Sequence, residues 1–220
     1  MRIEQIDFLR VSRWLFALLL VFGLVGCAGL GEYGPGAGAF DTVVLDAGHG
    51  AHDLGAKSVR GAPEKELALD VALRMKPLLE DAGYRVVMTR AHDVFIPLET
   101  RAAISNRYKS AIFVSIHFNW AKSRKPEGVE TYYFGDRGYR LAANILQEAL
   151  RAYRCADRGV KFARFHVLRN NLRPAVLCEL GFVSNPYDNQ LLQTPEVRQR
   201  LAEAVVRGII AERRGRIPRI

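Results

Sequence analysis

The chain has 220 residues, a formal net charge of +9, 49% hydrophobic residues and 25% charged residues. This length accommodates a leader and one domain, and the apolar content excludes a wholly disordered chain. The positive charge would suit an anionic polymer or surface, but the basic residues are spread out without the interleaved aromatics of nucleic-acid motifs, so we expect no nucleic-acid partner.

The first 26 residues predict an export signal. Arginines precede an apolar run at 14–25, which is too short to span a membrane as a helix of about 20 residues but fits the apolar part of a signal peptide. The following segment, Leu24-Val25-Gly26-Cys27, resembles the lipobox of bacterial lipoproteins. That resemblance implies cleavage before Cys27, acylation of its thiol and attachment to a lipid bilayer. An ordinary signal peptide with an incidental cysteine is the alternative.

Alanine rather than aspartate follows Cys27, a pattern that resembles lipoproteins sorted to an outer membrane. We therefore expect a cell-envelope protein that is lipid-anchored at the outer membrane and faces the periplasm. Residues 27–40 are rich in glycine and predict a flexible tether. We expect the catalytic domain to occupy 41–213 and a basic tail to occupy 214–220.

Strand and helix patterns alternate through the domain. Runs of Val, Ile, Phe and Tyr predict strands at 42–46, 84–90, 111–117, 129–134, 164–168 and 175–180. Apolar residues at helical spacing predict helices at 65–82, 98–108, 137–153 and 196–213. This alternation predicts an α/β fold, a three-layer sandwich whose mainly parallel central sheet of about six strands is flanked by helices.

Polar residues stand at the ends of three predicted strands. His49 follows the first strand, His117 closes the third, and Glu179 lies near the end of the last, where ligands bind in such sheets. Two imidazoles and a carboxylate are a common zinc set, because three protein ligands leave a fourth position for water. Since Ser184 and Cys178 lack the sequence context of an activated nucleophile, metal-assisted hydrolysis is favoured.

Short sequence blocks follow one another from about Val43 to Glu212. They are VVLDAGHG, DLGA, EKELAL, TR, RAAISN, VSIHFN, GVETYY, RGVK, VLRN and AVLCELGFVSNP. In this order they resemble the zinc-dependent N-acetylmuramoyl-L-alanine amidases of the Amidase_3 type. The resemblance implies a peptidoglycan substrate, and hydrolysis of the amide bond between N-acetylmuramic acid and L-alanine.

The same resemblance implies the roles of individual residues. His49, Glu64 and His117 would hold one Zn²⁺, and Glu66 competes with Glu64 for the carboxylate position. Zinc would polarise the scissile carbonyl and lower the pKa of its water toward about 7. Glu179 would act as the general base, taking the water proton and passing it to the leaving amine.

Other polar residues have two possible roles each. Arg101 and Asn119 either bind polar groups of the substrate or are solvated helix and turn residues. Asp46 either orients His49 as a hydrogen-bond acceptor or simply ends the first strand. The histidines that we expect not to bind metal are His52, His92 and His166.

Two alternative functions stay open: a non-catalytic peptidoglycan-binding lipoprotein with an amidase fold, and a zinc peptidase that cuts another peptidoglycan amide. All four expected site residues are present, which favours an enzyme. The stretch between His117 and Glu179 leaves little room for an inserted regulatory helix, so we expect an open groove. The sequence identifies no protein activator, and it leaves open whether Cys155 and Cys178 form a disulfide.

Overall fold

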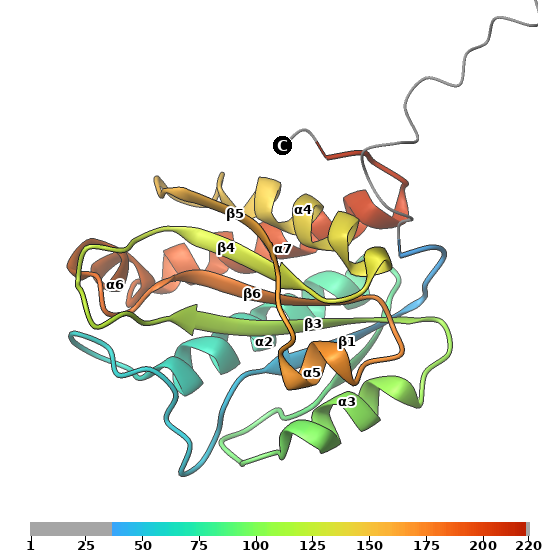
Figure 1. The fold of residues 1–220 in the computed structure, drawn as a ribbon, viewed down its shortest axis with the longest axis horizontal. Helices are drawn as coiled ribbons and strands as arrows, with labels where there is room; N and C mark the ends of the chain where they lie inside the picture. The colour runs from blue at the N-terminus through green and yellow to red at the C-terminus, as the bar shows by residue number, and fades with distance from the viewer. Residues whose placement is uncertain (1–36, 219–220) are drawn as a thin grey trace, which may run out of the picture. The chain divides into compact units, whose positions relative to one another are not determined.

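A six-stranded sheet forms the middle layer of the molecule (Figure 1). The computed structural model describes residues 37–218, and the strand order is β2-β1-β3-β6-β4-β5. The strands are β1 (Thr42–Ala47), β2 (Arg85–Met88), β3 (Ala111–Asn119), β4 (Val129–Tyr133), β5 (Asp157–Phe162) and β6 (Ala175–Phe182). Strand β4 runs antiparallel to β6, and the other neighbouring strands are parallel. The predicted mainly parallel sheet is confirmed.

Helices cover both faces of the sheet. They are α2 (Glu64–Asp81), α3 (Leu98–Asn106), α4 (Asp136–Ala149), α5 (His166–Arg169), α6 (Pro186–Leu192) and α7 (Pro195–Arg213). Helix α7 packs against both α2 and α4, and these three lie behind the sheet in Figure 1. The shorter α3 and α5 contact each other and lie on the other face. The predicted three-layer sandwich is therefore confirmed, with one thick and one thin helical layer.

Alternating side chains of β6 show how the core divides. Val176, Cys178 and Leu180 are buried in the large apolar cluster under α2, α4 and α7, whereas Leu177 belongs to a smaller cluster on the α3 and α5 side. Each fully buried aliphatic side chain stabilises the fold by roughly 1.5–3 kcal/mol. Because residues two apart in a strand share a face, Glu179 projects from the same thinly covered face as Leu177.

The register of the parallel strands brings their carboxyl ends to one edge. Asp46 of β1 pairs with Ser115 of β3, and His117 of β3 pairs with Glu179 of β6. In a parallel sheet this edge is where polar residues from separate strands meet. The fold thus gathers residues that are far apart in the sequence.

The strand predicted at 164–168 is wrong. These residues form a loop and α5, while the edge strand β5 lies earlier, at Asp157–Phe162. The apolar pair Val167 and Leu168 lies within α5 and is buried in the smaller cluster, so it gave a strand-like signal. Strand β5 is rich in charges, contains Gly159 and pairs irregularly with β4. An exposed edge strand of this kind has little apolar alternation by which it can be recognised.

The start of the described chain is fixed to the end of α7. The Ala37 amide donates a 2.7 Å hydrogen bond to Glu212 Oε1, and Phe40 stacks on Tyr84 with ring centroids 5.6 Å apart. Thr42 and Arg85 then begin the paired strands β1 and β2. This junction therefore lies at the amino-end edge of the sheet, opposite the carboxyl-end edge.

Several predictions concern residues outside the described range. The signal peptide at 1–26, Cys27 and its lipidation, most of the tether at 27–40 and the last two residues of the basic tail at 214–220 lie there. Within 37–218, no helix combines the length and apolar character needed to cross a membrane. Cys155 and Cys178 are free thiols in the structure.

Candidate metal centre

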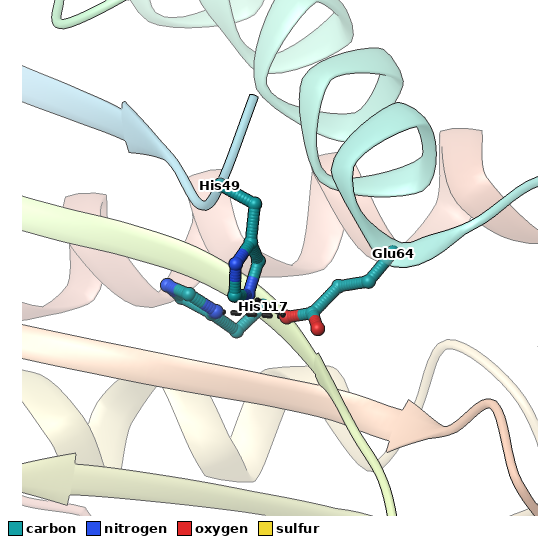
Figure 2. A group of neighbouring side chains, drawn as sticks. All are labelled: His49, Glu64 and His117. Atoms are coloured by element: carbon teal, nitrogen blue, oxygen red, sulfur yellow. Dashed lines mark hydrogen bonds and ion pairs between the residues drawn. The ribbon is translucent and has the colours of Figure 1, made fainter. Parts of the chain in front are cut away.

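Three side chains converge at the carboxyl-end edge of the sheet, as Figure 2 shows. Glu64 Oε1 lies 3.1 Å from His49 Nε2 and 2.8 Å from His117 Nδ1. One donor atom from each residue lies within 4.8 Å of the others. The two rings meet edge to face, with centroids 4.9 Å apart. These are the three residues predicted to hold the metal, and the structure brings them together.

Each side chain comes from a different element. His49 lies in the loop after β1, Glu64 is the first residue of α2, and His117 lies near the end of β3. Glycines allow this close approach: a Cβ at Gly48 would lie 2.3 Å from His117 Cε1, and one at Gly55 would lie 2.6 Å from Glu64 Oε2. Any larger residue at either position would displace a member of the group. This explains two glycines of the DAGHG and DLGA blocks.

Glu64, rather than Glu66, faces the two histidines. Its side chain is buried, and Oε1 accepts a 3.1 Å hydrogen bond from the Phe118 amide while Oε2 accepts a 2.7 Å bond from the Ala56 amide. Burial alone would raise the pKa of Glu64, but hydrogen bonds and charge interactions with His117 and His49 outweigh it and hold the pKa well below its usual range. Glu64 is therefore ionised, as a metal-binding carboxylate must be. Glu66 is exposed.

Asp53 orients His49. Its Oδ2 lies 2.8 Å from His49 Nδ1, on the opposite side of the ring from Nε2, which faces Glu64. Such an acceptor fixes the tautomer and direction of a metal-binding imidazole. Of the two roles considered for Asp46, orienting His49 is not what its contacts show, because its oxygens accept from the hydroxyls of Thr89 and Ser115 and from the Arg101 guanidinium.

We expect Asp53→Asn to weaken zinc binding about 10- to 100-fold, because loss of the orienting carboxylate lets the His49 ring rotate. Competition with a chromogenic chelator measures the affinity. Asp81→Asn is the matched control, since Asp81 is exposed at the end of α2. An unchanged zinc affinity in Asp53→Asn would show that other contacts hold the ring.

Arg101 is held by protein groups at the base of the site. It is only 2% exposed, and it donates to Asp46 Oδ1 at 2.8 Å and to the carbonyls of Ala47 at 2.7 Å, His49 at 2.6 Å and Ile96 at 2.8 Å. Although Arg101 lines the groove, these contacts engage each of its nitrogens. Its structural role is to fix the loop that carries His49. Contact between Arg101 and the substrate stays a prediction.

A second buried arginine fixes the same loop. Arg90 donates to the carbonyl of Ala47 at 2.9 Å and to that of Gly48 at 2.7 Å. The loop requires such support, since His49 has a φ of 61° and Ala51 a φ of 50°. A left-handed residue other than glycine costs of order 1–3 kcal/mol and persists only where its surroundings determine it. The two arginines hold His49 in this conformation.

Glu179 lies beside the three-residue group. It neighbours His117 across the β3–β6 pair and lines the same groove, while its Oε2 is buried without a hydrogen-bond partner among the described residues. Burial raises the pKa of Glu179 well above its usual value, and the charges of Glu64 and Glu130 raise it further. An unpaired buried carboxylate is costly, and a raised pKa makes it a stronger base. Both properties are typical of catalytic carboxylates.

The remaining predicted residues lie around the group. Asn119 Nδ2 donates a 2.7 Å hydrogen bond to Glu130 Oε1, and Asn119 lines the groove; its contact with substrate stays a prediction. His52 packs on the Phe95 ring, with centroids 4.4 Å apart. The group that could bind a metal in the described range consists of His49, Glu64 and His117, and that His52, His92 and His166 bind no metal stays a prediction.

The site opens onto a groove of about 540 Å³. The side chains of His49 and His117 are 23% and 17% exposed, so the donor atoms can be reached from solvent. The elements between His117 and Glu179 belong to the sheet and its helical layers, and no part of residues 37–218 closes the groove, in agreement with the expected open site. Its apolar walls come from Phe95, Leu98, Trp120, Phe165 and Val167.

The donor set fits a zinc ion. Two imidazole nitrogens and one carboxylate oxygen are the usual three ligands of a catalytic zinc, which keeps one further position for water or substrate. The ionised Glu64, the hydrogen bond that orients His49 and the exposure of the rings all agree with this chemistry. The arrangement can therefore support metal-assisted hydrolysis next to a basic carboxylate.

Comparisons with known proteins agree with one another. The Amidase_3 family model, described as N-acetylmuramoyl-L-alanine amidase, matches residues 43–211. The uncharacterized protein YqiI of Bacillus subtilis is 38% identical over 76% of this chain and 82% of its own. LytH of Staphylococcus saprophyticus, a probable cell wall amidase, is 36% identical over 77% of this chain, which spans only 57% of LytH. The solved N-acetylmuramoyl-L-alanine amidase AmiC2 of Nostoc punctiforme has a TM-score of 0.75 and 37% identity, covering 80% of this chain and 97% of AmiC2.

Proposed function

This chain belongs to the Amidase_3 family of N-acetylmuramoyl-L-alanine amidases, and on that premise we propose that it hydrolyses the amide bond between N-acetylmuramic acid and L-alanine in peptidoglycan, with one Zn²⁺. The observation that carries the zinc part of the proposal is the approach of His49 Nε2 and His117 Nδ1 to a single oxygen of Glu64. A basic carboxylate, Glu179, lies next to them. These are the groups that metal-assisted amide hydrolysis requires.

The metal would be held by His49 Nε2, Glu64 Oε1 and His117 Nδ1. When bound, zinc supplies Lewis-acid chemistry that polarises a carbonyl and makes a nucleophile from water near neutral pH. The protein contributes the fixed geometry of its donors: Asp53 orients the His49 ring, and the amides of Ala56 and Phe118 orient the Glu64 carboxylate.

Glu179 moves the proton in this proposal. Its buried Oε2 has no hydrogen-bond partner among the described residues, so it is free to accept the proton of the attacking water. The raised pKa of Glu179, caused by burial and by Glu64 and Glu130, makes it a better base than an ordinary carboxylate. The same atom then delivers the proton to the amide nitrogen of L-alanine as the C–N bond breaks. One carboxylate thus serves as base and then as acid.

We further propose that residues 1–26 direct export and that acylated Cys27 holds the protein in the cell envelope, facing the periplasm from the outer membrane. The apolar run, the lipobox-like segment and the alanine after the cysteine support this location. Peptidoglycan lies in the same compartment, so the proposed location and the proposed substrate agree.

Digestion of purified peptidoglycan tests the activity. We expect the form that lacks residues 1–27 to release stem peptides that begin with alanine, because only cleavage at the lactyl amide frees that amine. A chelator should abolish release, and added zinc should restore it. Mass analysis of the soluble products identifies the bond that is cut. Cleavage within the peptide would indicate a zinc peptidase, and binding without soluble products would indicate a non-catalytic wall-binding protein.

A further inference from the structure

Two of the sequence blocks, GVETYY and RGVK, contain none of the three candidate metal ligands. They contact each other at Glu130, because Arg158 and Lys161 of RGVK bond to the carboxylate of Glu130 in GVETYY. Glu130 lies on β4, is only 2% exposed, and stands directly opposite Glu179 in the antiparallel β4–β6 pair. Residues opposite each other in such a pair project from the same face of the sheet. Glu130 is therefore a buried carboxylate beside the proposed general base.

Donors from three elements surround the Glu130 carboxylate. Its Oε1 accepts hydrogen bonds from Asn119 Nδ2 at 2.7 Å and from the Tyr132 hydroxyl at 2.6 Å. Its Oε2 accepts from Arg158 Nε at 2.8 Å and from Lys161 Nζ. Burial would raise the pKa of Glu130, but the bonds from Lys161, Tyr132 and Arg158 outweigh it and lower the pKa. Glu130 is thus an anion that holds two cations in place.

Arg158 and Lys161 share the Glu130 carboxylate and still reach solvent. Their side chains are 33% and 37% exposed, and the charge of Asp188 also acts on Arg158. Arg158 uses its Nε–H for Glu130 and lies over the Phe182 ring, 4.9 Å from its centroid. Within 37–218 its two terminal nitrogens bond to no acceptor. A guanidinium held in this way has free donors for a carboxylate.

The cations lie on the β4 and β5 side of the site. Asn119 connects them to it, because its amide donates to Glu130 while Asn119 itself lines the groove with Glu179. In Figure 1, β4 lies next to β6 and β5 lies beyond β4, with α3 and α5 lower in the view. Asn119 and Glu179 line the groove, whereas Arg158 and Lys161 lie outside its lining and are partly exposed, so they would meet a part of the ligand that extends beyond the groove.

The chemistry of the proposed substrate indicates which of its groups Arg158 and Lys161 would bind. In peptidoglycan the N-acetylated sugars are neutral once the lactyl carboxyl has formed the scissile amide, so the ionised acids belong to the stem peptide. Two cations that face solvent beside the general base therefore match the peptide side of the bond.

We propose that Arg158 and Lys161, positioned by Glu130, bind a free carboxylate of the stem peptide next to the L-alanine that leaves. This inference rests on the proposed amidase function. It gives the enzyme a preference for stem peptides whose second residue carries a free carboxylate over peptides in which that group is an amide. Glu130 acts through the two cations and is a positioning residue.

Two synthetic muramoyl peptides that differ only at the second residue test the proposal, one with a free carboxylate and the other with the corresponding amide. We expect the wild-type enzyme to have a kcat/KM about tenfold higher for the carboxylate form, which is the effect of one partly exposed charge-assisted hydrogen bond. Arg158→Gln and Lys161→Gln should each reduce this ratio, with most of the change in KM. Glu130→Gln should also reduce it, because the cations lose their common anchor.

Arg164→Gln is the matched control. Arg164 is an exposed cation just beyond β5 whose guanidinium lies over the Phe134 ring, so its loss should leave the ratio unchanged. Variants of Arg158 and Lys161 that lower kcat/KM equally for both peptides would overturn the carboxylate subsite. A wild-type enzyme that cleaves both peptides equally would overturn it too and leave the amidase proposal intact. A wild-type enzyme that cleaves neither would contradict the amidase proposal and the subsite with it.

Discussion

Glu179→Gln should lower kcat about 10²- to 10⁴-fold, the usual contribution of a general acid–base group. Glutamine keeps the size of the side chain but has no oxygen that can take a proton from water at neutral pH. Zinc binding should persist, because the atoms that would hold the ion belong to His49, Glu64 and His117. Steady-state rates on soluble muropeptides and the zinc content of the purified variant measure the two quantities separately.

The same variant should fold at least as stably as the wild type in the absence of metal. Glu179 Oε2 is buried and unpaired among the described residues, and the raised pKa reports that its ionised form is disfavoured in the fold. A neutral amide removes that cost, and an unchanged or higher melting temperature would record it. Glu66→Gln is the control, since Glu66 is exposed on α2. A Glu179→Gln enzyme with more than a tenth of wild-type kcat would rule out the proposed proton transfer.

Arg101→Met should reduce the free energy of unfolding by about 3–5 kcal/mol, the cost of removing one partner from a buried ion pair. Asp46 is 1% exposed and would keep its charge with only the hydroxyls of Thr89 and Ser115 as donors. The carbonyls of Ala47 and His49 would also lose a donor. Urea unfolding monitored by circular dichroism measures the change in free energy.

Two further variants sharpen this test. Arg107→Met removes an exposed arginine just after α3 and should change the free energy of unfolding by no more than about 0.5 kcal/mol. Adding Asp46→Asn to Arg101→Met should recover part of the loss, because it removes the uncompensated charge. If Arg101→Met alone costs less than about 1 kcal/mol, the loop that carries His49 does not depend on this arginine.

The order of layers and the positions of His49, His117 and Glu179 could be predicted because they follow from general rules. Apolar runs indicate buried strands, and polar residues just after such runs collect at the carboxyl-end edge of a parallel sheet. The structure places all three residues at that edge. The choice of Glu64 over Glu66 came from the family resemblance, and it agrees with which of the two is buried.

Other features depend on contacts that sequence patterns do not encode. Asp53 was missed as the partner of His49, although the four-residue spacing within a tight loop is a usable signal. The burial of Arg101 against three carbonyls and Asp46 could not be predicted, because nothing in a helix pattern reveals such contacts. Strand β5 was missed because its charged residues hide the alternation of apolar and polar side chains that marks a strand. Two of these charged side chains, Arg158 and Lys161, bond to the buried Glu130.

The junction of Ala37 with Glu212 fixes where the chain enters the domain. The chain joins the domain at one end of the sheet, and the groove opens at the other. If Cys27 is fixed in a lipid surface as proposed, the ten peptide units to Ala37 reach at most about 35 Å. The reach of the groove into the wall would then be limited by the length of this segment and by the distance across the domain from Ala37 to the groove.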